Sequence, residues 1–273
     1  MKNRLLSIVC VLLTAVSLRA QPQDWTKPRL DGNSPRHQEW VKIPNGKRQV
    51  QSFITYPEVK DKATAVIVIH EIFGMSDWVR SVTDRLAEAG YIAIAPDLLS
   101  GAAPNGGGTS DLPASAVGKA IQALPPDQIT GDLNALYDYV SKLPACNGKV
   151  VVVGFCWGGG QSFRYATNNK NIKAALVFYG TPPPDESLPS IACPVYGFYA
   201  GNDARVSATV PKATEAMKSA GKVYEPVIYD GAGHGFMRAG EDPADAARGA
   251  IHAANVKAHD ESWDRWLALM KKI

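Results

Sequence analysis

A cysteine stands where a run of valines gives way to glycines. Cys156 lies in VVVVGFCWGGG, residues 150–160, with Gly154 two positions before it and Gly158 two positions after it. This G-x-C-x-G spacing matches the sharp strand-to-helix turn that presents a nucleophile, where glycines avoid collisions with the neighbouring strand and helix. The backbone N–H groups that begin the following helix would favour a thiolate. Cys156 is therefore a candidate nucleophile, and a small buried thiol is the alternative.

Two further segments supply partners for such a nucleophile. Asp203 ends the predicted strand 194–203, and His234 lies between glycines at the end of the predicted strand 223–236. Because the carboxyl ends of parallel strands meet at one edge of a sheet, we expect both side chains beside Cys156. Each alone has another explanation, a helix cap for the aspartate and a structural loop residue for the histidine. Their order along the chain, nucleophile then acid then histidine, predicts a catalytic triad.

A glutamate is predicted at the same edge of the sheet. Glu71 follows AVIVIH at the end of the predicted strand 63–71. A carboxylate beside a thiol can take its proton, whereas a salt bridge or a charge near a helix N-terminus would be a structural role. The pair His70–Glu71 opens no zinc motif, because position 74 is glycine. We expect neither a metal ion nor an organic cofactor.

Apolar runs of strand length alternate with amphipathic runs of helix length. This alternation predicts an α/β fold whose mostly parallel, twisted sheet has helices on both faces. Segments 39–44 and 48–58 alternate apolar and polar residues and predict an antiparallel hairpin at the N-terminal edge. The Gly- and Pro-rich segment 100–113 is predicted to be flexible, and His252 and His259 to lie on the solvated surface. Other predicted strands are 91–98, 150–153 and 172–180, and predicted helices are 76–90, 132–144, 158–168, 210–217 and 261–273.

The N-terminal residues differ in composition from the rest of the chain. MKNR, the apolar run LLSIVCVLLTAVSL and the polar RAQPQD predict a signal peptide over residues 1–20 and a single domain over 21–273. The apolar run is too short for a membrane span, and no later segment approaches 18 apolar residues. We therefore expect export to the periplasm or the extracellular space, with an uncleaved N-terminal anchor as the alternative.

The charge of the chain argues against polyanionic partners. The formal net charge of +3 includes Lys2, Arg4 and Arg19, which the predicted cleavage would remove. The remainder is near neutral and shows no basic stripe with interleaved aromatic residues. Nucleic acid and anionic membranes are therefore not expected as partners. We expect a small-molecule substrate and a monomer or small homo-oligomer.

Three cysteines remain after the predicted cleavage. They are Cys146, Cys156 and Cys193, an odd number, so at least one thiol is unpaired within the chain. Cys146 and Cys193 precede strands at the end of the sheet opposite to Cys156. The predicted strand 172–180 lies between their strands and separates them by roughly 9–10 Å, more than a disulfide spans unless the loops lean together. A Cys146–Cys193 bond is left open.

Five segments together resemble the dienelactone hydrolase family of α/β-hydrolases, from about residue 40 to the C-terminus. They are HEIFG (70–74), APDLL (95–99), GKVVVVGFCWGG (148–159), GNDARV (201–206) and GAGHGFMR (231–238). The resemblance implies an α/β-hydrolase fold with Cys156 as nucleophile, His234 as base and Asp203 as the residue that orients the base. It also implies that Glu71 keeps the resting thiol neutral and takes its proton when substrate arrives.

The resemblance further concerns the oxyanion hole and the substrate. It implies an oxyanion hole made by the backbone N–H groups of Trp157 and Ile72. Arg238 matches one of two arginines with which the family's typed enzyme clamps a substrate carboxylate, while the second matches the region of Gly101, where no arginine stands. Arg238 is thus a candidate substrate-binding residue, whereas Arg164 and Arg205 are less well placed.

These features predict hydrolysis of an ester or lactone through a thioester acyl-enzyme. Three alternatives remain. One is a general carboxylesterase or thioesterase that uses the same residues. Another is a hydrolase of a different bond, since this fold supports several chemistries. The third is a non-enzymatic binding protein that kept the fold.

Overall fold

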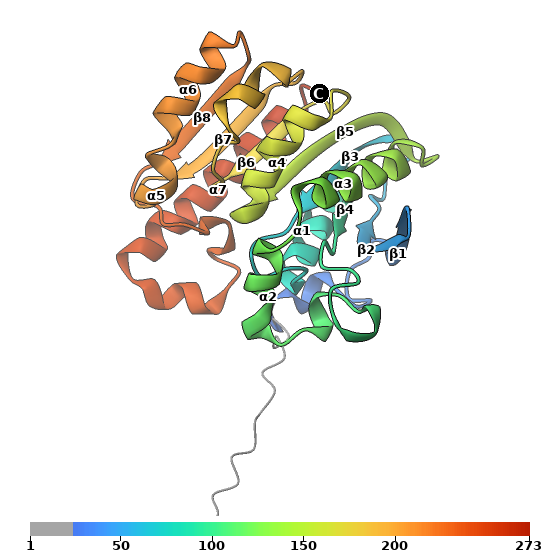
Figure 1. Ribbon diagram of the computed structural model, residues 1–273. Helices are drawn as coiled ribbons and strands as arrows, with labels where there is room; N and C mark the ends of the chain where they lie inside the picture. Colours follow the sequence, from blue (N-terminus) through green and yellow to red (C-terminus); the bar gives the residue numbers. More distant parts are fainter. Residues whose placement is uncertain (1–23) are drawn as a thin grey trace, which may run out of the picture.

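Eight strands form one mixed sheet in the computed structural model, which describes residues 24–273 (Figure 1). Their order across the sheet is β1-β2-β4-β3-β5-β6-β7-β8. β1 pairs antiparallel with β2, and β2 antiparallel with β4, whereas the remaining pairs are parallel. The mostly parallel sheet and the hairpin at its edge are therefore confirmed. The strands are β1 (Gln38–Asn45), β2 (Arg48–Thr55), β3 (Ala63–Ile69), β4 (Ile92–Pro96), β5 (Cys146–Phe155), β6 (Ala175–Phe178), β7 (Val195–Ala200) and β8 (Tyr224–Tyr229).

The centre of the sheet consists of strands without a polar face. β3 and β5 run side by side in parallel, with Ala65 opposite Val150 and Ile69 opposite Gly154. Every residue of β3 is buried, as is β5 from Val150 onward. Helices cover both faces of this region, which is why its strands are near-continuous apolar runs. The register places the end of β3 beside the turn that follows β5.

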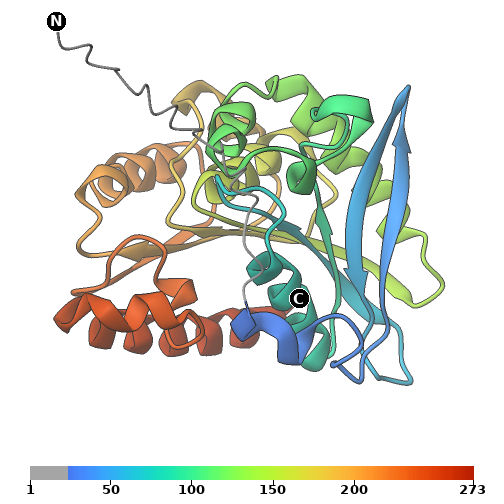
Figure 2. The ribbon, with the colours of Figure 1, turned by 90° about the horizontal axis from the view of Figure 1, so that it is seen from below.

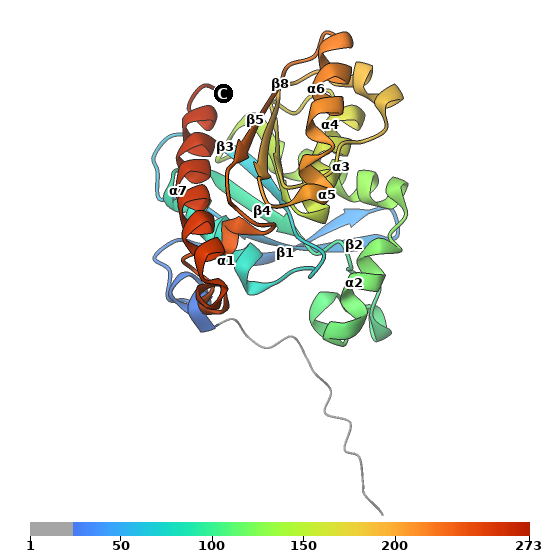
Figure 3. The same ribbon diagram turned by 90° about the vertical axis from the view of Figure 1, so that its left-hand side faces the viewer.

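Helices cover the two faces of the sheet (Figures 2 and 3). α1 (Asp77–Glu88) and α7 (Ala250–Met270) lie on one face, while α3 (Pro126–Ser141), α4 (Trp157–Asn168) and α6 (Val210–Ser219) lie on the other. The short α5 (Ala204–Ser207) follows β7. α2 (Ala114–Gln122) buries Val117 and Ile121 in a small cluster with Leu99, to which Ile72 and Trp157 add their side chains. α2 therefore covers the edge of the sheet at which the predicted catalytic residues lie.

Several boundaries differ from the predicted ones. β8 ends at Tyr229, because Gly231, with a φ of +72°, turns the chain, so His234 lies in the following loop and not in the strand. α3 begins at Pro126 and α7 at Ala250, each earlier than predicted. α2 has no counterpart among the predicted elements, because it buries only two of its side chains.

The Gly-rich segment 100–113 is tied to the sheet, contrary to the expectation of a flexible connection. The Asp97 carboxylate accepts hydrogen bonds from the backbone N–H and the hydroxyl of Thr109, both at 2.7 Å. Gly101 and Ala103 both donate to the carbonyl of Gly107. The buried Asp97 carboxylate thus anchors a segment that has few apolar side chains to pack. The composition of the segment does not reveal this anchor.

Other predictions have different outcomes. The predicted signal peptide lies outside the described residues. Among residues 24–273, no helix combines the length and the apolar character that crossing a bilayer requires. Cys146 and Cys193 both carry free thiols, and β6 lies between their strands as predicted.

Candidate active site

Cys156 occupies a strained turn between β5 and α4. Its φ of +56° and ψ of −118° are unusual for a residue with a side chain. The flanking glycines allow this turn to pack against the sheet. A Cβ on Gly154 would collide with the carbonyl of Gly158, and a Cβ on Gly158 with the carbonyls of Ile69 and His70. The glycine spacing seen in the sequence therefore has a steric cause.

His234 and Asp203 meet beside this turn. His234 Nδ1 lies 2.5 Å from Asp203 Oδ2, and the aspartate is 8% exposed. Asp203 Oδ1 also accepts a hydrogen bond from the backbone N–H of Val206, so it caps α5 as well. Asp203 therefore contacts His234 and caps α5 at the same time.

The surroundings of His234 favour its charged form. Burial lowers the pKa of His234, but hydrogen bonds with Cys156 and Asp203 and their negative charges outweigh it and raise the pKa to about 9. An imidazolium hydrogen-bonded to a cysteine sulfur stabilises the thiolate, which is the nucleophilic form. His234 is thus hydrogen-bonded to Asp203 and coupled electrostatically to Cys156.

Glu71 lies at the same edge but is paired with Arg238. Arg238 Nε and Nη2 donate to Glu71 Oε2 at 2.8 and 2.6 Å, and the glutamate is 3% exposed. The guanidinium also lies over the rings of Phe73 and Trp78, at 5.0 and 4.9 Å from their centroids. Arg238 therefore lies where the resemblance implies a substrate ligand, yet in this structure its charge is neutralised by Glu71.

Two backbone groups could form an oxyanion hole. Trp157 is the first residue of α4, so its N–H has no acceptor within the helix. Ile72 follows β3, and both residues line a cavity that contains Cys156. The positions predicted for the oxyanion hole thus lie around the sulfur.

Cys156 lines two cavities of different charge. The first, which we call the Arg164 cavity, has a volume of about 520 Å³ and is lined by Ile72, Gln122, Cys156, Trp157, Gly160, Gln161, Arg164, Tyr179, Thr181, Pro182, Pro183, Pro184, Arg205 and Val206. The second, the Glu71 cavity, has a volume of about 390 Å³ and is lined by Glu71, Ile72, Phe73, Cys156, His234, Gly235, Arg238, Asp242 and Asp245. Ile72 and Cys156 belong to both, so a substrate on the sulfur can extend in two directions.

Three residues of the Arg164 cavity escaped the sequence analysis as site residues. Tyr179 follows β6, has a φ of +41°, and places its ring 5.0 Å from that of His234. Burial raises its pKa well above the ordinary value, and the carboxylate of Glu71 adds to this, so the phenol stays protonated. Tyr179 follows the end of a strand, as Asp203 does, and this position could have identified it from the sequence. Arg164 and Arg205 line the cavity, although the sequence ranks them below Arg238.

The two histidines expected on the surface take part in polar networks. His259 is 5% exposed, and its Nε2 lies 2.7 Å from Arg85 Nη1. Because α7 begins earlier than predicted, His259 shares its inward face with Trp263, and the expectation for it is wrong. His252 Nδ1 lies 2.9 Å from Asp245, which accepts a hydrogen bond from Asn255.

Asn255 connects this network to the loop that carries His234. Its Oδ1 accepts a hydrogen bond of 2.7 Å from the backbone N–H of Gly233, the residue before His234. α7 therefore holds the loop that carries His234.

Among residues 24–273, no group of three or more His, Cys, Asp or Glu side chains could hold a metal ion.

Comparisons with known proteins identify the family of the chain. Residues 50–273 match the model of the dienelactone hydrolase family. Two proteins named "Putative carboxymethylenebutenolidase" are similar along most of their length. The one from Salmonella typhi is 32% identical over 238 residues, covering 82% of this chain and 83% of its own. The one from Escherichia coli (strain K12) is 30% identical over 246 residues, covering 85% and 86%.

A solved structure shows the same fold. The crystal structure named "Putative Dienelactone Hydrolase from Klebsiella pneumoniae subsp. pneumoniae MGH 78578" superposes with a TM-score of 0.73 at 26% identity, covering 88% of this chain and 100% of that one. Fold, family model and relatives agree, and the chain is a hydrolase that belongs to the dienelactone hydrolase family of α/β-hydrolases.

Proposed function

We propose that this hydrolase cleaves a carboxylic ester or lactone, with Cys156 as its nucleophile and a thioester as its intermediate. The observation that carries the proposal is the arrangement of Cys156, His234 and Asp203 at a strained strand-to-helix turn, where His234 is hydrogen-bonded to Asp203 and coupled electrostatically to Cys156. Nucleophile, base and orienting acid stand in the relation that acyl transfer requires. A purely structural thiol would need neither the strained backbone nor the ion-paired histidine.

In the first half-reaction, Sγ of Cys156 bonds to the carbonyl carbon while its proton is held by His234. The carbonyl oxygen becomes an oxyanion between the N–H groups of Trp157 and Ile72. As the carbonyl re-forms, the bond to the alcohol oxygen breaks, and His234 gives its proton to that oxygen. The product is an S-acyl Cys156 and a free alcohol, or an attached hydroxyl when the substrate is a lactone.

In the second half-reaction, a water molecule attacks the thioester. Neutral His234, oriented by Asp203, takes a proton from the water as its oxygen bonds to the carbonyl carbon. The C–S bond then breaks, the carboxylic acid leaves, and the thiolate and the imidazolium are restored. No metal ion or organic cofactor takes part in this scheme.

The role of Glu71 follows from its pairing with Arg238. His234 is the titratable side chain coupled to Cys156, whereas the Glu71 carboxylate is held by Arg238. We therefore assign the thiol proton to His234 in the resting enzyme. A Glu71 that takes this proton when substrate arrives would first have to leave Arg238.

Two substrate ranges are consistent with this mechanism. One is a lactone, as the family name implies, and the other is the range of acyclic esters and thioesters. Two cavities that meet at Cys156 provide space on both sides of the scissile bond, which favours an acyclic substrate with two extended parts. A panel of nitrophenyl esters, thioesters and lactones decides between them by kcat/KM.

The mechanism is tested by intact-mass measurement of the acyl-enzyme. Nitrophenyl acetate mixed with the protein and quenched in acid should add one acetyl group, mapped to Cys156 by peptide analysis. Cys156→Ala should lose both adduct and turnover. Cys193→Ala, which removes a buried thiol that lines neither cavity, should keep both. Turnover that persists in Cys156→Ala would refute the mechanism.

A further inference from the structure

The Arg164 cavity and the Glu71 cavity differ in charge. Two arginines and no carboxylate line the Arg164 cavity. Three carboxylates, those of Glu71, Asp242 and Asp245, line the Glu71 cavity with one arginine, which is already paired. An anionic group on a substrate is therefore attracted to the first cavity and repelled from the second.

Arg164 is held in place by neutral acceptors only. Its Nε donates to Gln161 Oε1 at 2.9 Å, Nη1 to the Thr130 hydroxyl at 3.0 Å, and Nη2 to the Pro126 carbonyl at 2.9 Å. A guanidinium has five N–H donors, so these bonds leave one on each terminal nitrogen. Burial lowers the pKa of Arg164, and the charge of Asp127 only partly opposes this.

Neither arginine has an acidic partner within the described residues. No carboxylate of residues 24–273 lies within ion-pair distance of Arg164 or Arg205. Some other half-buried arginines of the protein are paired, for example Arg48 with Asp132 and Arg85 with Glu241, whereas Arg265 donates to the carbonyls of Gly197 and Glu225. Arg164 is half-buried and oriented, and the charge of Asp127 acts on it without an ion pair, whereas Arg205 is exposed. Two guanidinium groups without an ion pair on one cavity wall make a site for an anion supplied from outside.

Arg164 lies on the same helix that begins after Cys156. Trp157, Gly160, Gln161 and Arg164 share one face of α4 at helical spacing, and this face lines the cavity. At 1.5 Å per residue, the Cα of Arg164 lies about 12 Å along the chain axis from that of Cys156. Because helical side chains lean toward the N-terminus, the guanidinium is displaced from its Cα toward the Cys156 end of α4.

The position of His234 decides which part of the substrate enters the Arg164 cavity. The leaving alcohol must lie next to His234, which protonates it, and His234 lines only the Glu71 cavity. The acyl part then extends into the Arg164 cavity. The walls of this cavity also include Trp157 and the three prolines 182–184.

We propose that the Arg164 cavity binds the acyl chain of a half-ester of a dicarboxylic acid, with Arg164 and Arg205 as ligands of its distal carboxylate. The proposal rests on the proposed ester hydrolysis at Cys156, to which it adds the substrate class. The two arginines here are specificity determinants and take no part in bond cleavage. They supply a carboxylate site on the side of Cys156 opposite to Arg238.

The kinetic test compares acyl chains of equal length with and without the distal charge. The kcat/KM for mono-p-nitrophenyl adipate should exceed that for p-nitrophenyl hexanoate by at least tenfold, and the same should hold for the suberate over the octanoate. High salt should reduce this preference. In Arg164→Gln/Arg205→Gln the preference for the charged esters should fall below threefold. Arg164→Lys keeps the positive charge but loses the planar set of donors, so it should retain part of the preference for the charged esters.

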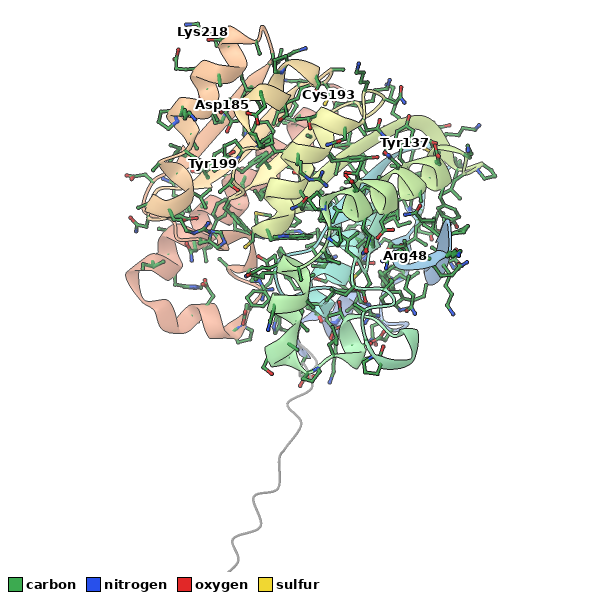
Figure 4. The ribbon with its side chains drawn as sticks, in the orientation of Figure 1. Arg48, Tyr137, Asp185, Cys193, Tyr199 and Lys218 are labelled. Carbon is green, nitrogen blue, oxygen red and sulfur yellow. The ribbon has the colours of Figure 1, made fainter. Side chains whose placement is uncertain are left out.

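A charge-matched control removes two positive charges elsewhere. Lys170→Gln/Lys218→Gln changes two exposed residues that line neither cavity, and Lys218 lies at the outer end of α6 (Figure 4). This control should keep the full preference. A wild-type enzyme that prefers the neutral esters, or a preference that survives in Arg164→Gln/Arg205→Gln, would overturn the proposal.

A binding measurement separates this proposal from the proposed function. Suberate should bind to Cys156→Ala in calorimetry, and Arg164→Gln/Arg205→Gln in the same background should bind at least tenfold more weakly. If no ester is turned over but suberate binds in this way, the ester-hydrolase proposal fails and the carboxylate site stands. If esters are hydrolysed but suberate binding does not depend on the arginines, the carboxylate site fails alone.

Discussion

Replacing Asp203 by asparagine isolates one charge in the site. Asparagine caps helices as well as aspartate does, so the bond from the Val206 N–H is kept while the negative charge beside His234 is lost. A rise of the His234 pKa from 6.5 to about 9 corresponds to ~3 kcal/mol, and Cys156 and Asp203 share it. Because His234 is 33% exposed, solvent screening reduces the Asp203 share to about 1 kcal/mol.

The sign of the pH dependence follows from the direction of the shift. A histidine whose pKa is raised in the folded state stabilises the fold fully below its unfolded pKa of 6.5. This stabilisation is lost as the pH rises through the folded value of about 9. The difference in unfolding free energy between wild type and Asp203→Asn should therefore be about 1 kcal/mol larger near pH 6 than near pH 9.5.

Urea unfolding at several pH values, followed by tryptophan fluorescence, measures this difference. The His234 proton resonances should titrate at a lower pH in the variant, and turnover should fall by about 10²–10⁴. Asp230→Asn, at an exposed carboxylate, serves as the control and should change none of these. An equal stability difference at every pH would refute the assignment of the charge coupling to Asp203.

Three further substitutions test separate parts of the structure. Glu71→Gln leaves Arg238 without its counter-charge and should lower the unfolding free energy by ~2–4 kcal/mol. The kcat of this variant should fall less than tenfold. A hundredfold fall in kcat would instead assign the thiol proton to Glu71. Gly158→Ala should lower the melting temperature sharply or prevent folding, because the added Cβ would collide with the carbonyls at the end of β3. The control Gly221→Ala has open space around it and should lower the unfolding free energy by only about 1 kcal/mol. Thr109→Val removes the hydroxyl that donates to Asp97 and should speed limited proteolysis within the Gly-rich segment; an unchanged cleavage rate would contradict the anchoring role of Asp97.

The arrangement of the sheet could be predicted because it depends on local patterns. Strands buried on both faces must be apolar throughout, and their alternation with amphipathic helices leaves few topologies. The beginnings of α3 and α7 could not be predicted in this way. Their first turns bury little apolar surface, as the exposed Ile251 of α7 illustrates, so they carry no clear periodicity.

The candidate site could be predicted as far as it depends on strand ends. Cys156, Asp203 and His234 follow strands of one parallel sheet, and that topology alone brings them together. Arg164 lies two turns into a helix, where an arginine ordinarily faces water. Its cavity depends on where α2, α3 and the Pro182–Pro184 loop pack, and such long-range packing leaves no mark in a single sequence.

The topology that brings these groups together also makes the site a late product of folding. Arg238 and its partner Glu71 are 167 positions apart in the chain, and the N–H of Gly233 is held by a residue of the C-terminal helix. Contacts between residues so distant in sequence require closure of long loops, which slows their formation. During refolding, secondary structure should therefore return before hydrolytic activity does. A truncated chain without α7 would lose both the support of the His234 loop and the core side chains of Trp263, Trp266, Leu269 and Met270.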